Sequence, residues 1–202
     1  MAYRPADGVS KFEYARMLCS ALAHLVAGQG DATGLTVFDA GLRTHISSRP
    51  GRSHLRTILT TLARTEPGGR SDPARALRRA VDMFRSRGIL IHVSDLYDDQ
   101  ETVQAELTRA AHIGHDVTVC HVLTPDELEW RWDDVELEDS ETGERVASGA
   151  RARDAYRARV SAFVAEWRSS CTRDGIEYLL ARTDTPLDLT LRSYLLQRGR
   201  RR

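Results

Sequence analysis

Side chains with hydroxyl or carboxylate oxygens occur at two places in this sequence, after a predicted strand and before a predicted helix. They are the residues best suited to bind a metal ion or to catalyse a reaction. Asp95 comes directly after an apolar run at 89–93, Asp98 lies just beyond it, and Ser71 opens a helical segment after a glycine pair. In an open parallel sheet, ligands bind at the carboxyl ends of the strands. Hydroxyl and carboxylate oxygens are ligands that Mg²⁺ takes from proteins. Ser71 and Asp95 therefore predict a partial metal site at that edge, with Asp98 as an auxiliary ligand.

Two other interpretations of these side chains stay open. Asp72 stands where an N-cap would begin one helix, and Asp98 or Asp99 where an N-cap would begin the next, so these carboxylates could serve only as caps. Strand-end carboxylates also fit a Mg²⁺-dependent, phosphatase-like hydrolase that uses Asp95 and Asp98. Such an enzyme needs a nucleophile or base, and the sequence has no P-loop, nucleophile elbow, GxGxxG or HExxH motif to supply one.

The histidines and cysteines are scattered and predict neither a metal centre nor a redox pair. His92 and His121 lie within apolar strands, where a hydrogen-bonded core or edge histidine is the ordinary interpretation. Cys19, Cys120 and Cys171 are odd in number and far apart. This spacing predicts reduced thiols in a cytoplasmic protein, with Cys120 and Cys171 as small core residues.

Alternating apolar segments must position the strand-end side chains. The continuous run at 89–93 indicates a strand buried on both faces, and a helical pattern at 100–113 and a second buried strand at 117–123 follow it. This alternation predicts an α/β protein with a parallel sheet. The other expected elements are helices at 9–27, 53–64, 73–87, 152–173 and 187–197, and strands at 35–38, 42–46 and 176–181.

An acidic segment interrupts the alternation. Residues 126–147 carry ten acidic side chains against only Arg131 and Arg145, and a Glu141-Thr142-Gly143-Glu144 turn lies between apolar positions. We interpret the segment as a hairpin inserted at the edge of the domain. Because no repeat and no second domain can be recognised, residues 1–202 are expected to form a single domain.

Composition excludes several classes of function. The chain has 202 residues, of which 41% are hydrophobic and 29% charged, an ordinary globular composition. The 29 basic residues balance 29 acidic ones, so no net charge attracts nucleic acid or an anionic membrane. No apolar run approaches the roughly 20 residues of a membrane span, and the first residues lack a signal-peptide core. Lys11 is the only lysine in this arginine-rich chain, which is typical of a GC-rich bacterial genome.

Several segments, taken together, resemble one bacterial family. They are Ser10-Lys11-Phe12-Glu13-Tyr14-Ala15, Gln29-Gly30-Asp31 with Gly34-Leu35-Thr36-Val37-Phe38-Asp39, Pro67-Gly68-Gly69-Arg70-Ser71-Asp72, Val93-Ser94-Asp95-Leu96, Gly114-His115-Asp116-Val117, and Asp184-Thr185-Pro186-Leu187 with Tyr194-Leu195. Over nearly its whole length, the chain is similar to the soluble branch of the family labelled domain of unknown function 58. The C-terminal part of that family is a von Willebrand factor A-like domain.

The resemblance implies a Rossmann-like von Willebrand factor A fold, with a mostly parallel sheet, one antiparallel edge strand and helices on both faces. It also implies a metal-ion-dependent adhesion site, in which Ser71 falls on the threonine position and Asp95 on the final aspartate position. The DxSxS motif of the family, and the first central strand before it, would precede Met1-Ala2-Tyr3. We therefore expect an incomplete site, weak Mg²⁺ binding and a truncated chain that lacks both the motif and the first central strand.

Members of this family are commonly encoded beside MoxR-type AAA ATPases. The resemblance therefore implies a non-enzymatic protein-interaction module, an adaptor or chaperone-like partner of such an ATPase in the cytoplasm. A Mg²⁺-dependent hydrolase is the alternative, and a structural fragment with no independent role is the third hypothesis. We expect the strand-end surface around Ser71, Asp95 and Asp98, or the acidic segment 126–147, to contact the partner.

Overall fold

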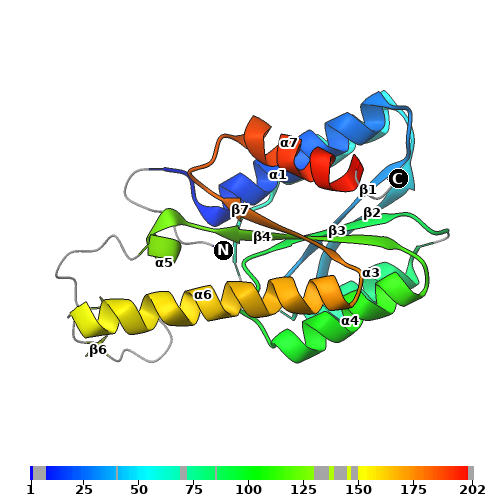
Figure 1. The fold of residues 1–202 in the computed structure, drawn as a ribbon. Coiled ribbons are helices and arrows are strands. Elements are labelled where there is room, and N and C mark those ends of the chain that lie inside the picture. Colours follow the sequence, from blue (N-terminus) through cyan, green and yellow to red (C-terminus); the bar gives the residue numbers. More distant parts are fainter. Residues whose placement is uncertain are drawn as a thin grey trace.

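The computed structural model of the chain describes residues 1, 8–39, 41–68, 72–84, 86–129, 137–138, 145–146 and 150–199. A parallel sheet lies between layers of helices, and an antiparallel pair of strands lies beside it (Figure 1). The chain is therefore a mixed α/β protein, as the alternation of apolar segments predicts.

The parallel sheet has the strand order β3-β4-β7. Its strands are β3 (Ile89–Ser94), β4 (Asp116–Leu123) and β7 (Glu177–Arg182). β4 is the central strand and is buried along almost its whole length, in agreement with its continuous apolar sequence. Ser94 pairs with His121, and His121 pairs with Leu180, so the three strands reach the same edge.

Helices cover both faces of this sheet, as expected (Figure 1). One face carries α3 (Pro73–Asp82), α4 (Gln100–His112) and α6 (Ala150–Arg173), and the opposite face carries α1 (Lys11–Gly28) and α7 (Leu187–Gly199). Alternate residues of β4 point into two separate cores. Val119 packs in the core that holds Leu107 of α4, and Val122 packs in the core that holds Leu18 of α1.

The antiparallel pair forms a sheet of its own, which corrects the expectation of one mixed sheet. β1 (Thr33–Phe38) and β2 (Leu42–Arg49) pair with each other, and α2 (Arg52–Arg64) packs against β1. Among the described residues, no hydrogen-bonded ladder joins β1 to β3. Side chains make the connection instead: α1 packs on both β1 and β3, and the rings of Phe38 and His92 stack with centroids 5.6 Å apart.

Two other segments depart from the sequence predictions. The helix expected over 73–87 ends at Asp82, because the chain tightens there and Phe84 donates its N–H to the carbonyl of Val81 at 3.1 Å. The segment 126–147, interpreted from the sequence as an inserted hairpin, overlaps a short helix, α5 (Pro125–Glu129). Further on, β5 (Leu137–Glu138) pairs antiparallel with β6 (Arg145–Val146), and the rest of the segment lies outside the described residues.

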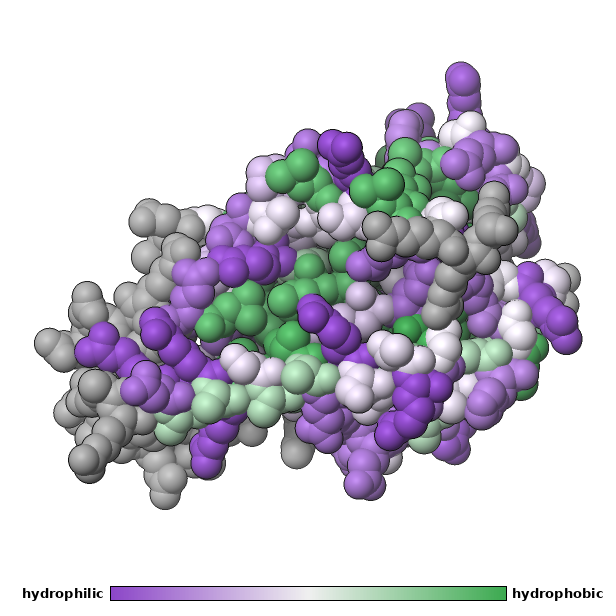
Figure 2. Space-filling model, in the orientation of Figure 1, coloured by the Kyte–Doolittle hydropathy of each residue, from purple (hydrophilic) through white to green (hydrophobic). Residues whose placement is uncertain are grey.

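The surface of α7 is unusually apolar for an outer helix. Figure 2 shows apolar side chains over this helix, where Leu189, Leu195 and Leu196 are exposed. Among the described helices, none combines the length and the apolar character that crossing a membrane requires.

Candidate functional site

The carboxyl ends of β3 and β4 bring together the candidate site that the sequence points to. Asp95 follows the last residue of β3 and lies in a turn shaped by the next residue, Leu96, which has a left-handed backbone (φ 58°). A non-glycine residue rarely adopts that conformation. Ser94 holds the turn, because its hydroxyl accepts a hydrogen bond from the Leu96 N–H at 3.1 Å.

The Asp95 carboxylate binds an ammonium group from the first turn of α1. The Nζ atom of Lys11 lies 2.9 Å from Oδ2 of Asp95 and 2.6 Å from Oε1 of Glu127. All three side chains are buried, with 5% of Lys11 and 12% of each carboxylate side chain exposed. Nζ also lies over the ring of Tyr97, 4.9 Å from its centroid. We call Lys11, Asp95 and Glu127 the strand-end triad.

A capping box fixes Glu127 within the triad. The Glu127 N–H donates to the Thr124 hydroxyl at 3.2 Å, while Oε2 of Glu127 accepts from the N–H and hydroxyl of Thr124 at 2.8 and 3.0 Å. Pro125 suits the first position of a helix. This reciprocal cap starts α5 and leaves the second oxygen, Oε1, to Lys11.

The charges around Asp95 outweigh its burial. Burial alone would raise the pKa of this carboxyl, but Lys11 and the amino group of Met1, 2.8 Å from Oδ2, lower the pKa below its ordinary value. Asp95 is therefore a carboxylate held in ion pairs at neutral pH. A carboxylate held in this way is a poor general base and a poor nucleophile.

His121 supports the same turn from β4. Its Nε2 lies 3.0 Å from the carbonyl of Asp95, and its Nδ1 lies 2.6 Å from the hydroxyl of Tyr178. Because a carbonyl only accepts, Nε2 carries the proton and Nδ1 accepts from the tyrosine. Burial lowers the pKa of His121 to about 4, so the ring is neutral at pH 7. The prediction of a hydrogen-bonded core histidine is confirmed here.

His92 does not follow that prediction. Its Nε2 is buried and has no hydrogen-bond partner among the described residues, and its ring is held by the stack on Phe38. Burial lowers the pKa of His92 to about 4. Cys120 and Cys171 are fully buried core residues with free thiols, as expected.

The other residues predicted for this edge are Ser71, Asp98 and the helix-cap candidates Asp72 and Asp99. Ser71 lies outside the described residues. Asp98 is half-buried three residues past Asp95. The helix-cap interpretation is confirmed for Asp72, which accepts from the Arg75 N–H at 3.0 Å, and for Asp99, which accepts from the N–H groups of the first turn of α4.

The described residues do not fit the expected metal site. No three His, Cys, Asp or Glu side chains in the described ranges gather in a way that could hold a metal ion. The Asp95 oxygen that would face a cation already contacts the Lys11 ammonium at 2.9 Å. A fixed positive charge at that distance repels a second cation.

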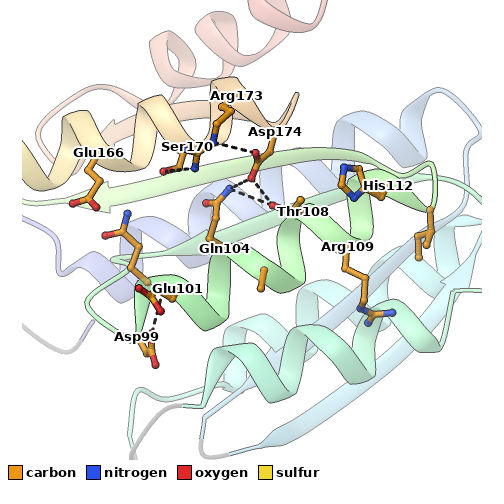
Figure 3. Close-up of a pocket in the computed structure, with 13 residues that line it drawn as sticks. Asp99, Glu101, Gln104, Thr108, Arg109, His112, Glu166, Ser170, Arg173 and Asp174 are labelled. Carbon is orange, nitrogen blue, oxygen red and sulfur yellow. Dashed lines mark hydrogen bonds and ion pairs between the residues drawn. The ribbon is translucent and has the colours of Figure 1, made fainter.

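A groove lined mainly by polar residues lies between α4 and α6 (Figure 3). It has a volume of about 1010 Å³, with Glu101 and Glu166 toward one end and His112 toward the other. Asp174 accepts from the Thr108 hydroxyl at 2.6 Å and from the Gln104 amide at 2.8 Å.

The bonds from Thr108 and Gln104 lower the pKa of Asp174, which makes it a weak base. We interpret Asp174 as a clasp that ties the end of α6 to α4. The groove therefore offers a polar contact surface rather than an assembled catalytic pair.

Three residues of the strand-end site were not predicted from the sequence: Lys11, Glu127 and Tyr97. Lys11 carried one signal, since it stands at helical spacing from Leu18 and Leu22, on the face that α1 buries. Glu127 carried another, because Thr124 and Glu127 have capping-box spacing. No sequence signal marks Tyr97.

Known proteins similar to this chain give a family but no activity. The chain is 29% identical over 137 residues to uncharacterised proteins of Mycobacterium tuberculosis and Mycobacterium bovis. The alignment covers 66% of this chain and 43% of the relative, so the chain spans less than half the length of the curated relatives it matches.

Two solved structures share the fold at low sequence identity. An aerotolerance-related membrane protein of Bacteroides fragilis is 16% identical, with a TM-score of 0.58 over 89% of this chain and 84% of its own. The conserved hypothetical protein BatB of Bacteroides thetaiotaomicron is 17% identical, with a TM-score of 0.55 over 89% and 82% of the two chains. Residues 1–169 match the family described as protein of unknown function DUF58. The chain belongs to the DUF58 family.

Proposed function

We propose that this chain is a non-enzymatic protein-interaction module with a von Willebrand factor A-like fold and an incomplete adhesion site. The observation that carries the proposal is the state of Asp95, which lies at the strand-end edge but is buried and bound to Lys11 at 2.9 Å. The edge where α/β sheets bind their ligands thus presents no free carboxylate from Asp95. Any Mg²⁺ binding at Ser71 and Asp95 is accordingly proposed to be weak.

Tyr97 gives the same edge a contact surface. Its side chain is 52% exposed, and its ring is stacked on Phe163 at 5.3 Å with an interplanar angle of 3°. Tyrosines that are rigid and half exposed are frequent anchors of protein interfaces, because they bury a large area at little entropic cost. We propose that the partner packs on Tyr97.

The proposed partner is a MoxR-type AAA ATPase, with this chain as an adaptor or chaperone-like component. Support comes from the family resemblance and from the acidic composition of 126–147, which suits a basic patch. A cytoplasmic location is part of the proposal and is supported by the three free cysteines, since disulfides are rare in that compartment.

Co-purification tests the proposal. The chain is expressed together with the MoxR-type ATPase encoded nearest to its gene, as wild type and as Tyr97→Ser and Leu196→Ser. Both substituted side chains are exposed, but only Tyr97 lies at the strand-end edge. We expect Tyr97→Ser to lose the ATPase and Leu196→Ser to retain it. Equal retention by both variants would exclude the strand-end edge, and no retention by wild type would exclude this partner.

A second assay separates the module from the hydrolase alternative. The hydrolase hypothesis requires Mg²⁺-dependent turnover of a generic phosphoester such as p-nitrophenyl phosphate, abolished by Asp95→Asn. We expect no turnover above a blank with either protein. Activity that disappears in Asp95→Asn would replace the interaction module by the enzyme.

A further inference from the structure

We infer that the ammonium group of Lys11 fills the cation position of the strand-end site, so that a side chain does the work of a divalent metal ion there. Nζ lies within 2.9 Å of one oxygen of Asp95 and one oxygen of Glu127. These carboxylates come from different elements, the turn after β3 and helix α5, and they converge on that single atom. The inference concerns the isolated chain and is independent of any partner.

The geometry around Nζ resembles a small cation site. Two carboxylate oxygens at 2.6 and 2.9 Å face one positive centre that is almost sealed from solvent. Ca²⁺ binds oxygens at about 2.3–2.6 Å and Mg²⁺ at about 2.0–2.1 Å. The spacing of the carboxylates is therefore closer to a calcium shell than to a magnesium shell. While Lys11 is present, its charge and volume exclude either ion.

The identity of residue 11 supports this role. The chain uses arginine for every other basic residue, and the one lysine is the side chain buried between Asp95 and Glu127. An ammonium is a compact point charge with three donors, whereas a guanidinium is a planar fork. Only the ammonium can stand in for a spherical cation. Lys11→Arg is therefore expected to be poorly tolerated although it keeps the charge.

Thermal melting of the full chain provides the test, with 5 mM CaCl₂, 5 mM MgCl₂ or 5 mM EDTA. Wild type is expected to melt at the same temperature in all three, within about 1 °C. Lys11→Ser removes the ammonium that Asp95 and Glu127 share and leaves only the Met1 amino group, 2.8 Å from Oδ2 of Asp95. Its melting temperature is expected to fall by about 10 °C. CaCl₂ should recover at least half of that loss, and MgCl₂ should recover less.

Two control variants make the rescue specific. Lys11→Ser combined with Asp95→Asn has one carboxylate at the site and should no longer respond to CaCl₂. Arg109→Ser removes a cation from Glu106, a buried carboxylate that Arg78 also binds. Arg109 also binds Asp82, but that carboxylate is exposed and Arg78 remains on Glu106. Arg109→Ser should therefore lose stability without rescue by CaCl₂.

Three results would overturn the inference. They are a wild-type melting temperature that rises by more than about 2 °C with a divalent cation, a Lys11→Ser variant that CaCl₂ does not stabilise, and an equal rescue of Arg109→Ser. If Lys11→Ser fails to fold even in CaCl₂, nuclear magnetic resonance of the wild type decides the question. The single lysine gives one side-chain NH₃⁺ signal, expected to exchange slowly with water and to stay unchanged in CaCl₂. Fast exchange, or a shift in CaCl₂, would refute the filled position.

Discussion

Acidification between pH 8 and pH 5 should destabilise this protein through His92 and His121, two buried histidines of the parallel sheet. His92 and His121 are 3% and 0% exposed, and burial lowers the pKa of each to about 4. In the unfolded chain both would titrate near 6.5. Since the unfolded state binds protons first as the pH falls, the free energy of unfolding is highest above pH 6.5 and decreases toward pH 4.

The size of the effect follows from these values. At pH 5, protonation stabilises the unfolded chain by about 2 kcal/mol per histidine and leaves the folded chain almost unchanged. The two residues together predict a loss of about 4 kcal/mol between pH 8 and pH 5, a large part of the roughly 5–15 kcal/mol of a typical domain. Asp95 adds nothing in this window: its pKa is lowered from 3.8, so its contribution is lost only at lower pH.

Urea unfolding at pH 8, 7, 6 and 5, followed by circular dichroism, measures the loss. His92→Phe removes one titrating group whose Nε2 has no partner among the described residues, and it should reduce the loss to about 2 kcal/mol. Ile58→Val, a change in the separate core cluster that Ile58 forms with Ala23 and Leu62, should lower stability equally at every pH. Equal stability of wild type at pH 5 and pH 8, or a full acid loss in His92→Phe, would refute the reasoning.

Three further predictions concern the contacts that hold the edge and the groove. Lys11→Met should cost about 3–5 kcal/mol in urea unfolding at pH 8, because it removes the cation that Asp95 and Glu127 share and leaves only the Met1 amino group beside Asp95, and a cost below about 1 kcal/mol would contradict the buried triad. Asp174→Ala should cost about 1–3 kcal/mol, because Thr108 and Gln104 lose their hydrogen-bond acceptor. Asp82→Ala, which breaks the exposed ion pair with Arg109, should cost less than about 1 kcal/mol. Equal costs would contradict the role of Asp174 in holding the end of α6 to α4. Thr124→Val removes the hydroxyl that caps α5 and should lower the free energy of unfolding by about 1–2 kcal/mol. An unchanged stability would show that the cap is dispensable.

The elements with strong local signals could be predicted from the sequence. The runs at β3 and β4 are mostly apolar on both faces and each contains one histidine, a pattern that identifies buried parallel strands. Ser10 and Glu13 have capping-box spacing, and the structure forms both hydrogen bonds of that box. Each of these signals comes from residues only a few positions apart, so it can be recognised from local composition and spacing.

The candidate site could be predicted only in part, because its decisive contacts are remote in sequence. The position of Asp95 at a strand end followed from the pattern, but Lys11 and Glu127 are 116 residues apart when they form their ion pair. The helical spacing of Lys11 places it on the buried face of α1, but nothing in the local sequence identifies the carboxylates that it contacts. The division into two sheets is not encoded in local patterns either, since it depends on which strands pair and not on the strands themselves.

The strand-end edge concentrates features that a fold does not need for stability alone. Leu96 is buried in a left-handed conformation that costs on the order of 1 kcal/mol or more for a non-glycine residue. A buried ion triad can often be replaced by apolar side chains with no loss, or with a gain of about 1–4 kcal/mol. His121 is fully buried, which lowers its pKa to about 4, and its Nε2 lies 3.0 Å from the Asp95 carbonyl. Since these costs fall on one turn, while the groove between α4 and α6 shows only a simple clasp, we place the functional face at the ends of β3 and β4.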